Sequence, residues 1–159
     1  MKRVLLIPVF VVQAVFFSVL TLHRFVDGDE GFYLLASRLV LMHKKPYLDF
    51  FYTQAPLLPD VYALWMKCFQ VSWIPARILP ALLTALLGVL VYEHVCHVTR
   101  NWVAGLSAVV MFASSTLIFA WFPVVKTYSL AGLFLFSAYA VVSRVVPPPK
   151  LDTEDLGFC

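Results

Sequence analysis

Apolar residues gather in long unbroken runs along this chain. Windows of about 19 residues mark four candidate membrane spans, at roughly 4 to 22, 76 to 97, 102 to 122 and 127 to 146. At about 1.5 Å per residue, each run is long enough to cross a hydrocarbon core of about 30 Å. Lipid offers the backbone no hydrogen-bond partner, and no period-two alternation suggests a barrel, so helices are expected. The pattern predicts an all-α, polytopic transmembrane fold.

The first apolar run follows a basic start, "MKR", as a signal peptide also does. The run from Val4 to Leu22 ends in "TLHRF", however, and not in a small-residue cleavage site. Because its length also suits a full crossing, we expect it to be retained as the first span.

Residues 23 to 75 form one long segment that is too often interrupted to span and too apolar for a free linker. Helical spacing predicts two interfacial helices in it, the first from Asp29 to His43 and ending before Pro46. Its expected apolar face comprises Phe32, Leu35, Ala36, Leu39 and Met42. The second helix follows "QAPLLP", with Val61, Leu64, Trp65, Cys68 and Phe69 at helical spacing.

Composition supports a membrane protein and excludes several other classes. Hydrophobic residues make up 62% of the 159 residues and charged residues 13%, with a mean hydropathy of +0.86. The net charge of +3 is small and its basic residues are scattered, so no nucleic-acid partner is expected. Cys68, Cys96 and Cys159 form no CxxC pair, which argues against a disulfide framework or a zinc site.

Basic residues in the short loops favour cytoplasmic termini. Residues 1 to 3, the turn around Arg100 and the segment with Arg144 and Lys150 would then share one side. The loop 23 to 75 would face the outer compartment. The expected location is a multi-pass position in a bacterial inner membrane with this loop in the periplasm. Residues 147 to 159, which begin with three prolines, are expected to form a disordered or aberrant tail.

Three carboxylates, in "FVDGDEGFYLLASR", directly follow the first span. Asp27 suits the N-cap of the first interfacial helix, and Glu30, three positions on, suits the return half of a capping box. Asp29 is then left without a cap to make, although a register with Asp29 as cap and Asp27 free stays open. A carboxylate facing a membrane cavity would have its pKa raised toward the range of a general base.

The Asp29-Glu30 pair, the "PYLDFFYTQAPLLP" stretch and "ARILPALLTALLGVLVYEHV" together resemble the N-terminal part of GT-C-type membrane glycosyltransferases. This class includes the RgtA/B/C/D-like family, protein O-mannosyltransferases and the lipid A aminoarabinose transferase. The similarity covers about residues 1 to 146. Complete members are longer and have further spans, and "PPPKLDTEDLGFC" does not resemble their continuation, so the chain is expected to be an N-terminal fragment.

The resemblance implies transfer of a sugar from a polyprenyl-phosphate-linked donor to a glycan, lipid or protein acceptor at the outer membrane face. The acidic motif maps onto Asp29, as the base that deprotonates the acceptor hydroxyl, with Glu30 beside it and Asp27 in the substrate site. The reaction would invert the anomeric carbon. It also needs cations where the departing phosphate gathers charge.

Cations for that phosphate are available in Lys44, Lys45 and Lys126, with His43 and Arg77 as further choices. Snorkelling toward headgroups is the alternative role for Lys44 and Lys45. The resemblance places Asp49 and Gln54 beside the catalytic cavity, although some relatives carry His next to Pro at the position of Gln54. An amide cannot exchange a proton at neutral pH, and turn chemistry around Pro46 and Pro56 explains both residues equally well.

No cofactor is predicted, and the sequence leaves open whether a divalent metal takes part. His94 and His97 lie one helical turn apart near Glu93 but have no third ligand nearby. The alternative function is a non-catalytic four-span membrane protein that acts in packing or assembly, with its acids serving as helix caps. A transporter is disfavoured because no span carries an acid near its middle.

Overall fold

The computed structural model describes residues 5 to 146, and these fold into helices joined by turns and loops. The predicted all-α class is confirmed. In chain order the helices are α1 Leu6–His23, α2 Glu30–Leu41, α3 Leu57–Phe69, α4 Trp73–Thr99, α5 Trp102–Ser114, α6 Thr116–Trp121 and α7 Tyr128–Val145. The tail predicted from residue 147 onward lies outside the described residues.

Three of the described helices, α1, α4 and α7, are long and apolar enough to cross a membrane. The predicted span at 102 to 122 is not one helix. It divides into α5 and α6 at Ser115, whose backbone is extended at φ −61° and ψ 128°. The hydroxyl of Ser114 donates to the carbonyl of Met111, an interaction by which serine competes with regular helix geometry. Three of the four expected spans are therefore single helices, and the fourth is a broken helix.

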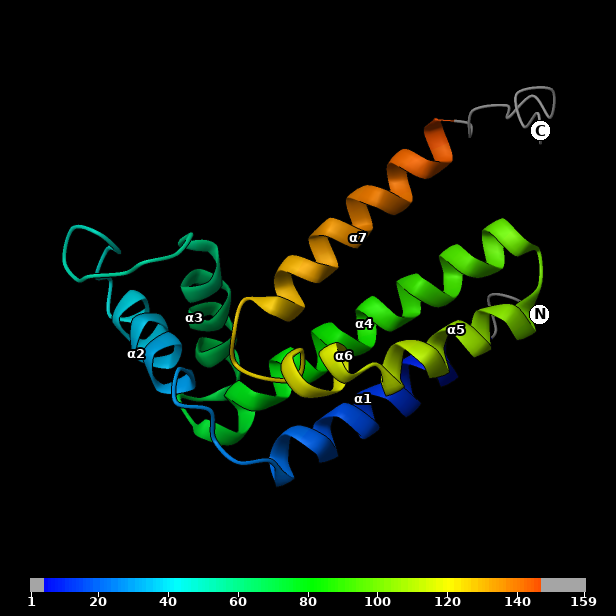
Figure 1. The fold of residues 1–159 in the computed structure, drawn as a ribbon. Coiled ribbons are helices and arrows are strands. Elements are labelled where there is room, and N and C mark those ends of the chain that lie inside the picture. Colours follow the sequence, from blue (N-terminus) through cyan, green and yellow to red (C-terminus); the bar gives the residue numbers. More distant parts are fainter. Residues whose placement is uncertain (1–4, 147–159) are drawn as a thin grey trace, which may run out of the picture.

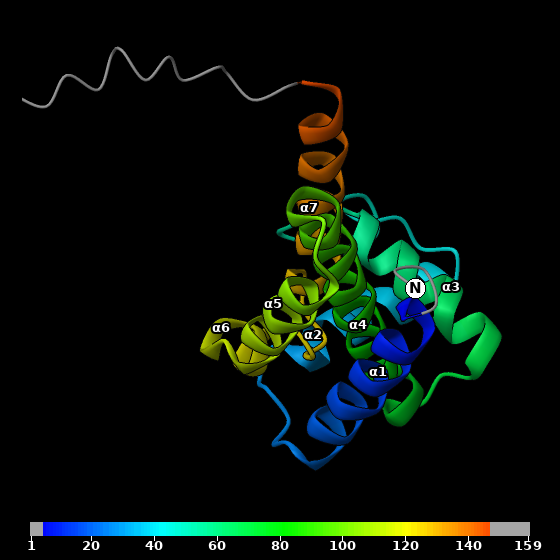
Figure 2. The same cartoon turned by 90° about the vertical axis from the view of Figure 1, so that its right-hand side faces the viewer.

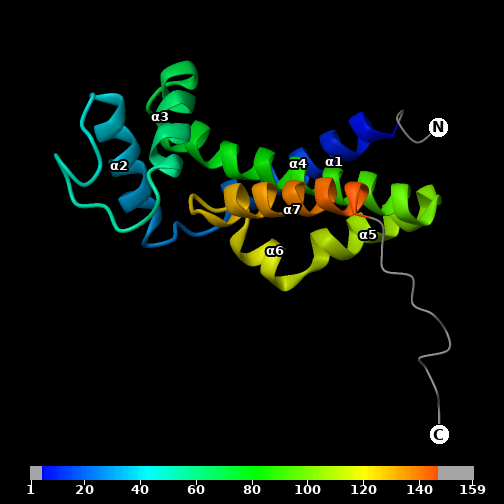
Figure 3. The ribbon, with the colours of Figure 1, turned by 90° about the horizontal axis from the view of Figure 1, so that it is seen from above.

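Helix α4 is the central element of the bundle. Helices α1, α5 and α7 lie along it, and α2 and α3 form a pair beside its N-terminal end (Figures 1 and 2). The view from above shows α2 and α3 at one end of the bundle and the α4–α5 turn at the other (Figure 3). Because the helices alternate in direction, the end of α1 and the α6–α7 connection lie at the same end as α2 and α3.

Helices α1 and α4 approach closely where Gln13 lies over Gly88. A Cβ added to Gly88 would stand 2.0 Å from Oε1 of Gln13, so the glycine makes room for this buried amide. Small residues allow this kind of approach between membrane helices. Neither side-chain atom of the amide has a hydrogen-bond partner among the described residues.

Helix α2 ends two residues earlier than predicted, by a Schellman motif and before Pro46 can act. His43 adopts a left-handed φ of 64°, and its N–H donates to the carbonyl of Val40 at 2.8 Å. The N–H of Lys44 donates to the carbonyl of Leu39 at 3.0 Å, which completes the motif.

The two interfacial helices exist as predicted, but their apolar faces are only partly turned inward. In α2 the buried residues are Glu30, Tyr33, Ala36 and Ser37, whereas Phe32, Leu35 and Met42 of the predicted face are exposed. In α3 the buried residues are Leu58, Pro59, Tyr62, Ala63 and Met66, whereas Leu64 and Phe69 are exposed. In a membrane protein apolar faces can turn outward toward lipid, so the facing rule for soluble helices fails here.

Helix α3 is tied to the start of α4 by a specific contact. The indole Nε1 of Trp65 donates to the carbonyl of Pro75 at 2.7 Å. Beneath it, Tyr62 and Leu58 are fully or almost fully buried and pack with Leu79 of α4 and Val125 of the α6–α7 connection. This cluster joins the loop helices to the bundle and fixes the surroundings of the acidic segment.

Candidate functional site

Lys126 holds two of the three carboxylates that follow α1. Its Nζ lies 2.9 Å from Oδ1 of Asp27 and 2.9 Å from Oδ2 of Asp29. The lysine side chain is 8% exposed, and the side chain of Asp29 is 66% exposed. The first loop and the α6–α7 connection therefore meet in one charged cluster at the end of the bundle.

The α6–α7 connection presents Lys126 from a buried stretch. Pro123, Val124 and Val125 are buried ahead of it, and the N–H of Lys126 donates to the carbonyl of Val124 at 2.7 Å. The ammonium also lies 5.2 Å from the centre of the Trp121 ring, within the range of a cation–π contact. Buried backbone and an aromatic wall thus restrict where the ammonium can go.

Two hydrogen bonds between backbone and side chains link the three acids at the start of α2. The N–H of Asp29 donates to Oδ1 of Asp27 at 3.0 Å, and the N–H of Asp27 donates to Oε1 of Glu30 at 3.4 Å. The carboxylate of Asp29 makes no such cap bond, and regular helix begins at Glu30. Asp29 therefore occupies the N-cap position, as in the second of the two registers, although without a side-chain cap bond, and Asp27 accepts from its N–H in the turn ahead of the helix.

Glu30 has a second partner that the capping pattern did not reveal. Its carboxylate is fully buried and accepts from Nε of Arg77 at 3.0 Å and from Nη2 at 3.2 Å. The same guanidinium donates to the backbone carbonyls of Arg24 at 3.2 Å and Phe25 at 3.1 Å. Arg77 thus connects α4, the end of α1 and the start of α2.

Arg77 was expected only as a spare cation for phosphate, and the structure gives it this fixed place instead. Its ring neighbour is Trp73, whose centre lies 5.9 Å from the guanidinium carbon. A sequence signal existed: an arginine in the first turns of an apolar span is rarely buried without a carboxylate partner. Glu30 and Arg77 are far apart in the chain, however, and no local spacing pairs them.

Asp27 and Lys126 each stabilise the charged form of the other. A hydrogen bond from Lys126 and a second from the N–H of Asp29 lower the pKa of Asp27 below its usual value of 3.8. Burial opposes the charged form of Lys126, but hydrogen bonds to Asp27 and Asp29 outweigh it and raise the pKa of the ammonium. Burial, with a further contribution from the charge of Glu30, raises the pKa of Tyr62 well above 10.0.

The other predicted site residues lie on the loop between α2 and α3. Oδ2 of Asp49 accepts from the N–H of Lys45 at 2.7 Å, which closes a turn as the alternative reading expects. Nε2 of Gln54 donates to the hydroxyl of Tyr33 at 2.7 Å, and Tyr47 donates to the carbonyl of Gln54. Gln54 thereby ties the loop to α2 about one turn beyond Asp29.

Lys44 and Lys45 do not join the charged cluster. Both residues are exposed, and no ion pair to a carboxylate is found for either among residues 5 to 146. The structure therefore unites Asp27, Asp29 and Lys126, sets Glu30 beside them with Arg77, and leaves both lysines of the loop apart.

The far end of the bundle carries further charged and imidazole groups. Glu93 pairs with Arg144 at 3.1 Å, and His94 is buried against the rings of Phe136 and Tyr139. Within the described part of the chain, no three His, Cys, Asp or Glu side chains are grouped so as to hold a metal ion. Cys68 is exposed and Cys96 is buried.

Comparisons with protein families, curated proteins and solved structures find no match for this chain.

Proposed function

We propose that this chain forms the acceptor-activating part of a GT-C-type membrane glycosyltransferase. It would move a sugar from a polyprenyl-phosphate-linked donor to a hydroxyl of a glycan, lipid or protein. The observation that carries the proposal is the contact of Asp29, mostly exposed, with buried Lys126 at 2.9 Å. A carboxylate open to solvent and a cation beside it are the two groups that this reaction needs.

In the proposed reaction the acceptor hydroxyl attacks the anomeric carbon from the side opposite the lipid phosphate. The new carbon–oxygen bond forms as the bond to the phosphate oxygen breaks, and the lipid phosphate leaves with the electron pair. Asp29 takes the proton of the hydroxyl. One oxygen of its carboxylate contacts Lys126, and the exposure of the side chain leaves room for an acceptor at the other.

Lys126 would serve the donor side of the same site. An ammonium has three N–H donors, and Asp27 and Asp29 engage two of them. The third is available to an oxygen of the leaving phosphate, which gains negative charge as the bond breaks. Asp27 then acts on the substrate through Lys126, because it fixes the position of the ammonium.

Other fixed groups support this arrangement. The Glu30–Arg77 pair holds the backbone on both sides of Asp27, through the carbonyl of Phe25 and the first residue of α2. A general base must lie within hydrogen-bond distance of the acceptor hydroxyl, and a fixed backbone keeps its carboxylate in that position. The proposed location is the periplasmic face of a bacterial inner membrane, with both termini in the cytoplasm.

The test is sugar transfer by membranes that contain the protein, supplied with a polyprenyl-phosphate-linked sugar and an acceptor extract. Asp29→Asn retains the shape of the side chain but cannot accept the proton, so we expect transfer to fall by at least about a hundredfold. Asp60→Asn is the matched control, since Asp60 is an exposed acid in the first turn of α3. It should leave transfer unchanged.

Transfer that survives Asp29→Asn would refute the assignment of the base. The second candidate function, assembly with other membrane proteins, is favoured by a different aspect of the same contact. Lys126 joins two carboxylates of the first loop, as a purely structural tie between loops also would. That reading predicts no transfer by the wild-type chain and the recovery of partner proteins after mild solubilisation.

A further inference from the structure

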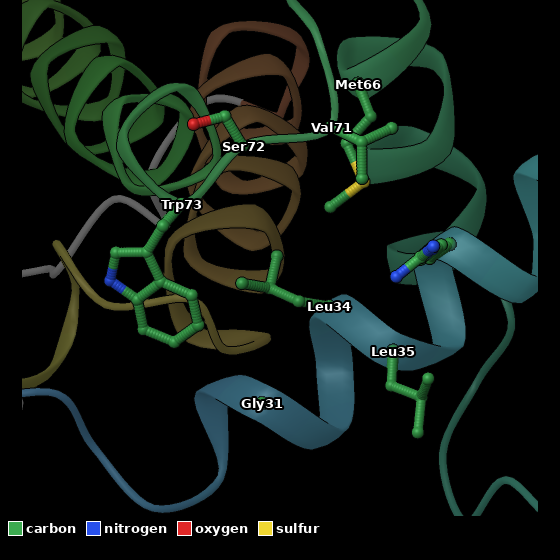
Figure 4. Close-up of a pocket in the computed structure, with 8 residues that line it drawn as sticks. Gly31, Leu34, Leu35, Met66, Val71, Ser72 and Trp73 are labelled. Atoms are coloured by element: carbon green, nitrogen blue, oxygen red, sulfur yellow. The ribbon is translucent and has the colours of Figure 1, made fainter.

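A pocket of about 290 Å³ lies between α2, α3 and the first residue of α4. Its lining comprises Gly31, Leu34, Leu35, Arg38, Met66, Val71, Ser72 and Trp73. Figure 4 shows Leu34 between the indole of Trp73 and the side chains of Met66 and Val71. The walls are thus apolar, with a guanidinium and a hydroxyl among them.

Arg38 is the charged group of this pocket and has no counter-ion. It is exposed, and no carboxylate among residues 5 to 146 lies within ion-pair distance of it. The acids of the nearby cluster are engaged by Arg77 and Lys126. The hydroxyl of Ser72, which precedes α4, makes no cap hydrogen bond either.

The position of the pocket along α4 indicates that it lies at the depth where lipid headgroups meet hydrocarbon. Trp73, which forms one wall, is the first residue of the longest membrane-spanning helix, and its indole is 38% exposed. Tryptophan is typical of this depth, where its ring is half in the apolar layer. The volume is at the lower limit of ligand pockets, roughly 300 Å³, and suits part of a lipid better than a whole one.

We propose that this pocket binds an anionic phospholipid of the surrounding bilayer. The phosphate of the headgroup pairs with the guanidinium of Arg38. The first part of one acyl chain lies against Leu34, Met66 and Trp73, and the rest stays in the bilayer. Apolar walls beside an unpaired cation, at headgroup depth, favour this occupant over a free anion or a peptide. Binding here does not depend on sugar transfer.

The experiment measures lipids retained by the full chain in native mass spectrometry after exchange into a neutral detergent. Phosphatidylglycerol and phosphatidylcholine of the same chain length are the probes. We expect phosphatidylglycerol to bind about tenfold more tightly, and Arg38→Gln to remove that difference. Lys67→Gln is the matched control, because Lys67 is an exposed cation on α3 outside the pocket. It should leave the preference intact.

A second variant tests the cavity instead of the charge. A Cβ at Gly31 meets no heavy atom within 4 Å, and Gly31 lines the pocket, so Gly31→Leu adds an apolar side chain at the pocket wall from α2. We expect it to weaken phosphatidylglycerol binding at least fivefold while Arg38 is still present. Gly28→Leu adds the same side chain at an equally open position outside the pocket, and it should bind like the wild type.

Inorganic phosphate separates the lipid from a free anion. At millimolar concentration it should not displace phosphatidylglycerol, because it leaves the apolar walls empty. Three results would overturn the proposal: equal binding of the two lipids, unchanged preference in Arg38→Gln, or full displacement by phosphate. Circular dichroism and elution as one species in size-exclusion chromatography establish that each variant is folded. A folded variant that no longer binds the lipid has therefore lost the binding site and not the fold.

Discussion

Arg77 of α4 and Glu30 of α2 form a buried ion pair, with Nε and Oε2 at 3.0 Å and both side chains at most 4% exposed. The same guanidinium also holds two backbone carbonyls at the end of α1, those of Arg24 and Phe25. One side chain therefore joins three segments of the chain. Its charge is compensated by a single carboxylate.

Removal of either partner of this pair is expected to destabilise the fold strongly. In Glu30→Gln the guanidinium of Arg77 stays buried but loses its counter-charge. In Arg77→Met the carboxylate of Glu30 stays buried without its cation. We expect each to lower the free energy of unfolding by about 3 kcal/mol or more. Denaturation titrations in mixed micelles measure this. The double variant should lose much less than the sum, and purely additive losses would contradict the pairing.

An added methyl group at Gly88 is expected to lower stability while Gln13 is present, because the buried amide must move to make room. A Cβ at this position meets the whole amide, with Oε1 at 2.0 Å and Cδ at 2.7 Å. Gly88→Ala should therefore lower the free energy of unfolding by about 1–3 kcal/mol, as overpacking does. In a Gln13→Ala background the same change should be nearly neutral. Gly31→Ala, which meets open space, is the control.

The tie between the first loop and Lys126 should hold across neutral pH and fail in acid. Since the pKa of Asp27 is lowered from 3.8, its contribution is present above that value and is lost as pH falls through the lowered pKa. Since the pKa of Lys126 is raised from 10.5, its contribution is present below that value and is lost as pH rises through the raised pKa.

The corresponding measurement compares the wild type with Lys126→Met over the acid range. The variant should be less stable near neutral pH, and the difference should shrink as pH falls below 3.8 toward the lowered pKa of Asp27. A difference that persists unchanged at the lowest pH would show that the ion pair contributes nothing and that Lys126 acts through packing alone.

Gln54 is expected to hold the α2–α3 loop against α2. Its Nε2 donates to the hydroxyl of Tyr33 at 2.7 Å, and the loop contains the exposed pair Lys44 and Lys45. Loss of this hydrogen bond should lower the free energy that holds the loop against α2 by about 1 kcal/mol. Tryptic cleavage after Lys44 should then increase about fivefold. Gln54→Leu and Tyr33→Phe should behave alike. Tyr139→Phe, on the membrane helix α7, should cleave like the wild type.

The helices could be predicted from the sequence because lipid makes long apolar runs conspicuous. The direction in which each helix turns its apolar face could not be predicted from these runs. In α2, Leu35 and Met42 are exposed while Glu30 and Ser37 are buried. A periodic pattern identifies the apolar side of a helix but does not say whether protein or lipid covers it. The break at Ser115 was missed for a related reason, since serine occurs in intact membrane helices as well.

The site could be predicted only as far as local spacing reaches. The contact of Glu30 with the N–H of Asp27 was predicted from the capping pattern, but the N-cap position falls on Asp29, the alternative register, and not on Asp27. Lys126 was singled out as a cation at the right end of the bundle, but as a phosphate ligand and not as the partner of Asp29. The pairing of Arg77 with Glu30 depends on how α4 packs against α2. This packing cannot be predicted from the sequence around either residue.

The contact between the first loop and Lys126 also has a consequence for synthesis. Asp27 and Asp29 leave the ribosome soon after α1, whereas Lys126 follows only after α4, α5 and α6 have been made. Until then both carboxylates are without the ammonium that holds them in the finished fold. Assembly of the charged cluster therefore waits until the α6–α7 connection has been made, long after the first loop.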